Sequence, residues 1–345
     1  DAADHIRLAL EVDQDPRIDQ VWVQHEFGLY QGGDGQFLLQ FLNAVEKPVA
    51  VTFHTVLPSP SPERIAMIRA LAERASDVVV LTERSGRILR EEYAIDADKI
   101  IVIPHGTHVV AWHDKEKMKK KYGLTGRRVL STFGLLSSNK SIETALDALV
   151  AIKAEVPDVL YLILGRTHPE VVRQEGERYR DSLVEKVEVL GLNEHVRFVD
   201  RYLELDELLE YLQLTDIYLF TSKDPDQAVS GTFAYAMGCG CPVISTRIPH
   251  AQEVLDDGTG VLIDFNSPTQ LADAATALLT DPERMDRLGR NALQRMRATA
   301  WDNVAIAHAR TFARRTGATE ELSFQWPPVS LKHLERMTDD IGMVQ

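Results

Sequence analysis

Short apolar runs alternate with longer segments of helical periodicity along most of the chain. The short runs are rich in β-branched residues, as strands are, and the longer segments repeat their apolar residues at helical spacing. Such alternation is typical of βαβ units with parallel sheets. A first set of strands is predicted at Gln20–His25, Pro48–His54, Asp77–Thr82 and Lys99–Pro104, and a second at Arg128–Phe133, Val159–Leu164, Val196–Phe198, Thr215–Phe220, Pro242–Ser245 and Gly260–Ile263.

Helices are predicted between these strands, and one of them begins with Pro62, where a missing N–H group costs nothing. The pattern at residues 5–10 is also helical, so we expect that further residues precede Asp1. The predicted helices are Gly35–Val45, Pro62–Arg74, Ser85–Glu92, His113–Lys121, Ser141–Glu155, Pro169–Leu190, Leu205–Leu212, Gly231–Gly238, Ser267–Leu279, Pro282–Ala298 and Trp301–Thr316.

Two successive α/β sets in 345 residues fit two Rossmann-like domains better than one core. Lysines and acids are interleaved at residues 113–121, which favours a solvated helix at the joint over a nucleic-acid patch. The sequence therefore predicts an N-terminal domain at 1–120, incomplete at its start, and a C-terminal domain at 121–300. Residues 301–317 are expected to form a helix that crosses back, and 318–345 a tail or linker leading to a further domain.

The net charge is −14 at pH 7, which argues against bulk nucleic-acid binding because that requires a basic face. A small anionic ligand is still compatible with this charge, since a few local cations and helix N-termini can hold a phosphate. Cys239 and Cys241 are too close for an unstrained disulfide, so we expect buried free thiols in a cytoplasmic protein. No apolar run reaches the roughly 18–20 residues of a membrane span.

Ligands of parallel sheets bind in the loops that follow strand ends. One such segment, 222–244, runs through a polar loop into a helix and then a Gly-Cys-Gly-Cys-Pro turn. Ser230 and Thr232 are natural N-caps, and Gly231 lets the backbone approach a ligand closely. The free N–H groups and the dipole of this helix start favour an anion such as a diphosphate, although an ordinary capped helix is the alternative.

Two further loops after predicted strands carry cations. The loop Gly134–Lys140 combines a glycine at a strand end with short hydroxyl groups such as that of Ser138. Lys140 stands at a helix start, which is unfavourable for the helix dipole unless an anion is bound. Arg166 follows the next strand along the chain. For each motif alone, an ordinary surface cation remains an alternative.

Histidines lie at the ends of three of the four strands in the first set. They are His25, which precedes Glu26, and also His54 and His105. A histidine at such an edge can bind a sugar or a phosphate, or act as an acid or base, and a structural histidine fits the pattern about as well. His-x-His and His-x-x-x-His spacings are lacking, so no metal site is predicted.

Together these loops resemble the family-4 type of retaining, nucleotide-sugar-dependent glycosyltransferases with the GT-B fold. The resemblance covers roughly residues 20–316 and is carried by VTFHTVLP (51–58), KIIVIPHG (99–106), the Gly134–Lys140 loop and AMGCGCPVISTRIPHAQEVLDDGTGVLIDF (236–265). It implies an α/β protein with two facing Rossmann-like domains and a donor bound in the cleft between them.

The resemblance also implies roles for single residues. Lys140 matches the lysine that holds the donor diphosphate, and His54 matches the histidine that reaches the donor sugar. The backbone cradle of the diphosphate falls on Val229, Ser230 and Gly231. The other donor-binding candidates are Gly134, Ser138, Arg166, Gln227 and Thr232, and the acceptor-side candidates are His25, Glu26 and His105.

Three departures from the family pattern stand out. Its arginine position is Leu135 here, and the two glutamates of its Glu-x7-Glu motif fall on Gln227 and Tyr235. Tyr235 cannot accept a pair of ribose hydroxyl hydrogen bonds as a carboxylate does. We hypothesise that Arg166 replaces the missing arginine. The usual N-terminal strand and its Gly-rich loop would precede Asp1.

The predicted reaction is transfer of a hexosyl group from a nucleotide diphosphate sugar to a hydroxyl acceptor, saccharide or other, with retention and without a metal or other cofactor. One alternative is a catalytically silent GT-B module that binds a carbohydrate or a partner domain, as the lost glutamates and the tail suggest. A GT-B phosphorylase or sugar-nucleotide epimerase ranks lower. The sugar, the nucleotide and the acceptor are not predicted.

Overall fold

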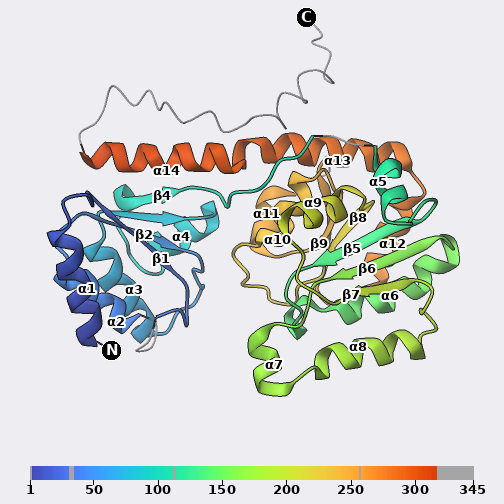
Figure 1. Ribbon diagram of the computed structural model, residues 1–345, viewed down its shortest axis with the longest axis horizontal. Helices are drawn as coiled ribbons and strands as arrows, with labels where there is room; N and C mark the ends of the chain where they lie inside the picture. The colour runs from blue at the N-terminus through green and yellow to red at the C-terminus, as the bar shows by residue number, and fades with distance from the viewer. Residues whose placement is uncertain (1, 31–34, 112–113, 256–257, 317–345) are drawn as a thin grey trace, which may run out of the picture. The chain divides into compact units, whose positions relative to one another are not determined.

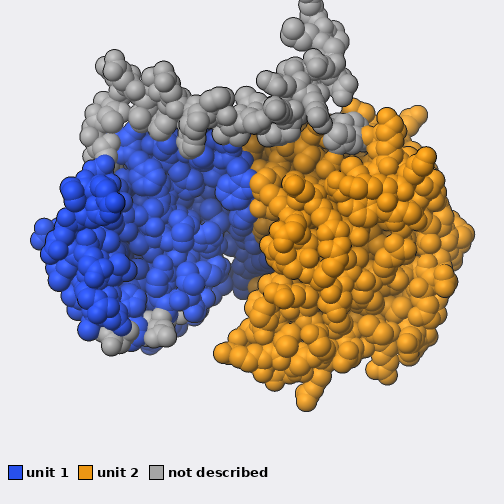
Figure 2. Space-filling model, in the orientation of Figure 1, with its two compact units in different colours: residues 1–106, 226–229, 301–325 blue, residues 107–225, 230–300, 326–345 orange. Residues whose placement is uncertain are grey.

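The computed structural model describes residues 2–30, 35–111, 114–255 and 258–316, and the chain divides into two compact units (Figure 1 and Figure 2). The first unit holds the described residues up to Gly106, the short segment Asp226–Val229 and the last helix. The second holds the rest of Thr107–Ala300. The predicted α/β class with two parallel-sheet domains is confirmed. His113 and the tail at 318–345 lie outside the described residues.

The first sheet is parallel, with its four strands in chain order. Its register places His25 opposite Phe53, and Phe53 opposite Val80, so three strands end at one edge. Helices α1–α4 contribute to one core on one face of this sheet. The elements are α1 (Ala2–Gln14), β1 (Val21–His25), α2 (Gln36–Ala44), β2 (Val49–Phe53), α3 (Pro62–Arg74), β3 (Asp77–Val80), α4 (Glu83–Glu91), the 3-10 turn η1 (Ala97–Lys99) and β4 (Ile100–Val102).

The last helix, α14 (Trp301–Thr316), covers the other face of the first sheet (Figure 1). Its Val304 packs in one cluster with residues of β3 and the segment after β4. Trp22 of β1 donates from Nε1 to Thr52 Oγ1 at 2.7 Å, and its ring centroid lies 4.4 Å from those of His308 and Phe312. The chain therefore returns to the first unit at its end.

The second sheet is also parallel, in the order β10-β9-β8-β5-β6-β7. The chain moves outward from β5 to β7 and then starts again at β8 on the other side of β5. This reversal of strand order is a topological switch point, the usual ligand site of open α/β sheets. The strands are β5 (Arg128–Phe133), β6 (Val159–Leu164), β7 (Val196–Val199), β8 (Ile217–Phe220), β9 (Val243–Thr246) and β10 (Gly260–Ile263).

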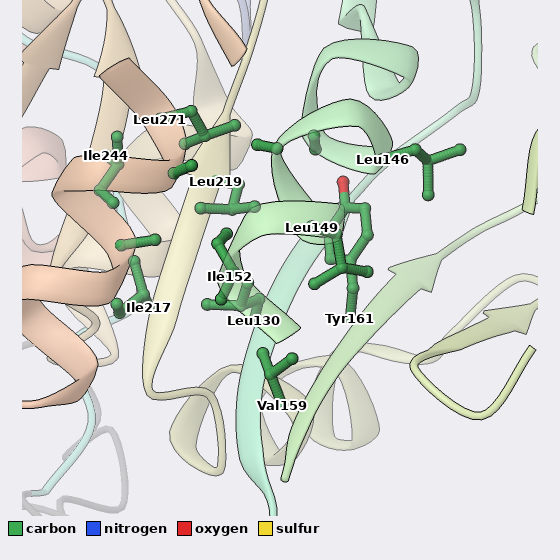
Figure 3. Packing of buried hydrophobic residues seen from close by; sticks show 14 of the residues in the cluster. Leu130, Leu146, Leu149, Ile152, Val159, Tyr161, Ile217, Leu219, Ile244 and Leu271 are labelled. Carbon is green, nitrogen blue, oxygen red and sulfur yellow. The ribbon is translucent and has the colours of Figure 1, made fainter. Parts of the chain in front are cut away.

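Alternate side chains of the second sheet enter two separate cores, because successive residues of a strand face opposite sides. Tyr161 and Ile163 of β6 pack with α6 (Ile142–Glu155), α8 (Arg178–Val189) and α12 (Pro268–Leu279) (Figure 3). Leu160 and Leu162 pack with α9 (Leu205–Gln213), α10 (Gly231–Gly238) and α11 (Pro249–Val254). Strands buried on both faces explain the continuous apolar runs of the sequence.

The helices of the second unit differ from the sequence pattern at two places. The predicted single helix at 169–190 is wrong: Gly176, with φ +69°, separates α7 from α8. Helix α11 was not predicted, because its six residues are too few for a helical period to stand out. The helices are α5 (Lys115–Lys121), α6 (Ile142–Glu155), α7 (Pro169–Glu175), α8 (Arg178–Val189), α9 (Leu205–Gln213), α10 (Gly231–Gly238), α11 (Pro249–Val254), α12 (Pro268–Leu279) and α13 (Pro282–Met296), with 3-10 turns η2 (Ser138–Lys140) and η3 (Arg297–Thr299).

No helix in the described part of the chain is long and apolar enough to cross a membrane.

The two cysteines lie in the apolar core beneath α10, buried and free. Cys241 donates from Sγ to the Leu212 carbonyl at 3.0 Å. Burial raises the pKa of the Cys241 thiol to about 12 and that of Cys239 well above its usual value. Neither thiol therefore carries the thiolate character that reactivity requires.

Helix α5 belongs to the second unit, which begins at Thr107 rather than at residue 121. The physical reason is a buried ion pair: Lys119 Nζ lies 2.8 Å from Asp216 Oδ2, with the side chains 1% and 4% exposed. Asp216 also accepts from the Val129 N–H at 2.6 Å. The pair ties α5 to the second sheet.

Replacing Lys119 by methionine should destabilise the protein by about 3–5 kcal/mol, because the Asp216 carboxylate would remain buried without its cation. Chemical denaturation followed by circular dichroism measures the change. Lys121→Met is the matched control, since the Lys121–Glu210 pair has side chains 58% and 29% exposed, and such pairs contribute about 0–1 kcal/mol. Equal losses in the two variants would contradict this account.

Candidate functional site

Two loops meet at the switch point of the second sheet. One follows β5 and contains Gly134 and Lys140; the other follows β8 and leads to α10. Thr221 donates from Oγ1 to the Lys140 carbonyl at 2.7 Å, and the Lys223 N–H donates to the Asn139 carbonyl at 3.0 Å. The β8 loop therefore fixes the backbone of η2, which carries Lys140.

Gly134 lets three segments come together at the end of β5. Its φ is +122°, a backbone conformation that side chains disfavour. A Cβ added at this position would lie 2.9 Å from Lys140 Nζ and 3.3 Å from Thr232 Cγ2. The structure thus places Gly134, Lys140 and Thr232 in contact distance, three residues that the sequence assigned to the donor site.

The Lys140 side chain is partly buried, and its amine donates to the Phe133 carbonyl at 3.3 Å. No carboxylate of the described residues forms an ion pair with it. Burial lowers the pKa of Lys140 from 10.5 to about 8, because the desolvated amine loses stabilisation of its charge. An anion bound at Lys140 would restore that charge.

The start of α10 offers unpaired backbone donors. Ser230 is the N-cap, and its Oγ accepts from the Phe233 N–H at 3.3 Å and lies 3.0 Å from Thr232 Oγ1. The N–H groups of Gly231 and Thr232 have no hydrogen-bond partner within the described ranges. Together with the helix dipole, these two amides favour an anion.

Arg166 lies on a loop that pairs with the β5 loop through its backbone. The Leu136 N–H donates to the Arg166 carbonyl, and the His168 N–H donates to the Leu136 carbonyl, both at 2.9 Å. The Arg166 side chain is exposed and makes no ion pair or hydrogen bond to any residue that the structure describes. Ser138 is exposed, and Leu135 is 39% exposed.

The positions of the two family glutamates carry no carboxylate. Gln227 donates from Nε2 to the carbonyl of Val229 at 3.3 Å. The Tyr235 ring packs edge-on to His108, with centroids 5.1 Å apart, and lies 6.3 Å from the Phe133 ring. At position 235 the aromatic contacts of a tyrosine therefore replace the two carboxylate oxygens with which the family's glutamate accepts hydrogen bonds.

Of the three histidines predicted at strand ends of the first unit, His54 and His105 are partly accessible, whereas His25 is buried. His54 Nε2 lies 2.8 Å from Gln24 Oε1, and Glu26 accepts from Thr55 Oγ1 at 2.9 Å. His25 is only 1% exposed, with its ring against Phe27, Tyr30 and Phe53. The His25 ring could reach a bound molecule only if these neighbours moved.

His105 is partly buried, and its Nδ1 lies 2.6 Å from the Gly106 carbonyl. Burial lowers the pKa of His105, and the nearby charge of His54 lowers it further, whereas the Gly106 contact raises it. The two histidines are thus close enough to interact electrostatically. Over the residues described, no group of three or more His, Cys, Asp or Glu side chains is arranged to hold a metal ion.

Two residues that no sequence motif marks, Thr221 and Tyr218, shape the site from beneath. Thr221 fixes Lys140 as described above. Tyr218 is fully buried and shares hydrogen bonds with the Phe133 N–H at 3.4 Å and with the Thr232 side chain, so it links β5, β8 and α10. Both residues belong to apolar runs, and no local motif marks them.

A sequence comparison identifies the family of the chain. The sequence profile of the family described as "Glycosyl transferases group 1" matches residues 114–295, which is more than half of the chain and includes all of the second sheet. The chain belongs to the group 1 glycosyl transferases. Its resemblance to GT-B glycosyltransferases is thereby confirmed.

Curated relatives of this group 1 chain include spore coat protein SA of Bacillus subtilis, 22% identical over 68% of the chain and 63% of that protein. A D-inositol 3-phosphate glycosyltransferase of Corynebacterium glutamicum is 26% identical over 67% of the chain and 55% of that enzyme. The chain therefore spans roughly half to two thirds of the length of these relatives.

Solved structures support the GT-B fold of this group 1 chain. The Anabaena protein HepE in complex with UDP aligns with TM-score 0.72 and 19% identity over 91% of this chain and 82% of that one. Sucrose-phosphate synthase of Thermosynechococcus elongatus aligns with TM-score 0.75 and 19% identity over 92% and 79%. Because the sequence identities to these two structures are low, the alignments show a shared fold alone.

Replacing Gly134 by alanine should displace the Lys140 amine and strain the backbone, at a cost of about 1–3 kcal/mol. Binding of pyrophosphate, followed by calorimetry, should weaken as well. Gly123→Ala is the control, because Gly123 has φ +67° but nothing within 4 Å of an added Cβ. Pyrophosphate affinity that changes equally in both variants would contradict the assigned role of Gly134.

The Lys140 amine should titrate near pH 8 in the folded protein, and anion binding should weaken as the pH rises through that value because the positive charge is lost. Between about pH 8 and 10.5 the unfolded chain binds more protons at this group, so folding stability from Lys140 should rise with pH. NMR titration of ¹³C-labelled lysines measures the midpoint. A midpoint for Lys140 at the value of exposed lysines would contradict its desolvation.

Proposed function

We propose that this chain carries the nucleotide-sugar site of a retaining hexosyltransferase, which transfers a hexosyl group from a nucleotide diphosphate sugar to a hydroxyl acceptor. The observation that carries the proposal is the closeness of Lys140 and Thr232 at Gly134, together with the amides of Gly231 and Thr232, which have no hydrogen-bond partner among the described residues. Each of these groups favours an anion, and all lie where α/β sheets bind their ligands. Membership of the group 1 glycosyl transferases supports it.

In the proposed reaction, the site must stabilise the diphosphate as it leaves the sugar. As the bond between the anomeric carbon and the phosphate oxygen breaks, negative charge grows on the diphosphate. The Lys140 ammonium and the two amides would stabilise that charge more in the transition state than in the ground state. Arg166, whose guanidinium has no partner in the part of the chain that the structure describes, is the proposed second cation. These groups would neutralise the diphosphate without a metal.

The sugar and the acceptor are assigned to the first unit on the basis of the family resemblance. His54 would orient the donor sugar, and its contact with Gln24 holds its ring in place. Glu26 and His105 are the proposed acceptor-side residues, and the buried His25 ring would support this edge of the sheet by packing on Phe27, Tyr30 and Phe53. Retention would follow from attack on the face that the diphosphate leaves.

The nucleotide class is open between uridine and guanosine. HepE of Anabaena has been solved with UDP and with UDP-glucose. A mycobacterial relative, 27% identical over 51% of this chain and 44% of that enzyme, is named as a GDP-mannose-dependent mannosyltransferase. Tyr235 stands at the position of the glutamate that binds the ribose in the family. Uridine and guanosine nucleotides should therefore both be included in the first test.

A catalytically silent binding module is the second candidate, and the replacement of both family glutamates by Gln227 and Tyr235 favours it. An assay for release of UDP from UDP-glucose and UDP-N-acetylglucosamine, and of GDP from GDP-mannose, separates the two. Release that depends on an added acceptor, with an α-linked product by NMR, supports the transferase. Nucleotide binding without release supports the silent module, and conversion of the sugar nucleotide alone would indicate an epimerase.

Removal of either cation should weaken nucleoside diphosphate binding. Lys140→Ala is expected to reduce affinity for UDP or GDP by roughly 100-fold and Arg166→Ala by roughly tenfold, as for lost charge-assisted hydrogen bonds. Arg173→Ala is the control, because Arg173 is 77% exposed and, among the residues that the structure describes, pairs only with Glu170 on its own helix. Calorimetric affinities measure the effects. Unchanged affinity in Arg166→Ala alongside a loss in Lys140→Ala would refute the role of Arg166.

A further inference from the structure

A histidine on α11 contacts the start of α10. His250 is 6% exposed, and its Nδ1 accepts a hydrogen bond from the Ser230 backbone N–H at 3.1 Å. Its ring centroid lies 5.0 Å from that of Phe233, in a tilted arrangement. His250 therefore touches both the N-cap peptide of α10 and a side chain of its first turn.

This contact decides which amides of α10 remain available. The Ser230 N–H is used by His250, and the Phe233 N–H is used by Ser230 Oγ. The Ala234 N–H enters the regular helix ladder by donating to the Ser230 carbonyl. Of the amides from Ser230 to Ala234, those of Gly231 and Thr232 are left without a partner in the described part of the chain.

The position of His250 is also fixed by contacts outside α10. Its helix begins with Pro249, and the neighbouring Ile248 and Ala251 are buried in the core shared with the second sheet. The preceding strand is tied to the β8 loop, because Thr246 donates from Oγ1 to the Ser222 carbonyl at 2.7 Å. His250 is thus a rigid acceptor against which the Ser230–Gly231 peptide can be aligned.

We infer that His250 is a positioning residue, which holds the Ser230 amide so that the consecutive Gly231 and Thr232 amides present themselves to one phosphate group of a nucleoside diphosphate. The inference rests on the proposed function. Because Nδ1 accepts, the neutral ring carries its proton on Nε2. The role therefore requires an acceptor atom at the Nδ1 position and no charge on the side chain.

Three variants test this requirement. Asparagine places its side-chain oxygen near the Nδ1 position, glutamine places it near Nε2, and leucine removes the acceptor at similar volume. Affinity for UDP, GDP and pyrophosphate is measured by calorimetry on the full chain, with thermal unfolding of each variant. His195→Leu is the control, because His195 Nδ1 lies 2.9 Å from the Val159 carbonyl at the amino end of the second sheet.

We expect His250→Leu and His250→Gln to weaken binding of pyrophosphate and of the nucleoside diphosphate by a similar factor of about ten, whereas His250→Asn keeps it within about twofold. His195→Leu should lower stability without changing affinity. If leucine disrupts folding, the comparison of asparagine with glutamine still decides, since both are polar carboxamides.

Two negative results are distinguishable. If the unchanged protein binds none of the three probes, the proposed function fails and the inference fails with it. If the unchanged protein binds and the folded His250→Gln and His250→Asn variants bind equally well, the proposed function stands and the positioning role of His250 is wrong.

Discussion

The close approach of two glycines at neighbouring strand ends is the constraint on which the candidate site depends. A Cβ on Gly165 would lie 2.4 Å from the Gly134 carbonyl oxygen, and both glycines have positive φ. With these two loops in contact, Lys140 can lie over Gly134, and Thr232 can approach from α10. A side chain on Gly165 would separate the two loops, and a side chain on Gly134 would displace Lys140 and Thr232, the groups that favour an anion.

The fold was largely predictable because parallel strands buried on both faces give unbroken apolar runs, such as Val159–Leu164, whose bounds match the structure. Each error has a physical cause. Gly176 broke a predicted helix, since a single glycine is tolerated in helices and does not by itself indicate a break. The joint was misplaced because the ion pair of Lys119 with Asp216 joins residues far apart in sequence.

The site was predictable only where the chemistry lies in a loop. Gly134, Lys140 and the Ser230–Thr232 segment follow strand ends, and the structure brings them together. Thr221 and His250 were missed because their roles arise from tertiary contacts at buried positions that carry no motif. In the sequence, His25 lies at a strand end just as the more accessible His54 and His105 do. The alternation of side chains along β1 nevertheless places His25 in the core.

A crystal structure of the chain with a bound nucleoside diphosphate, UDP or GDP, tests the central claim most directly. The account predicts that one phosphate lies within hydrogen-bond distance of Lys140 Nζ and of the Gly231 and Thr232 amides. A diphosphate bound elsewhere, with Lys140 still directed only at the Phe133 carbonyl, would contradict it.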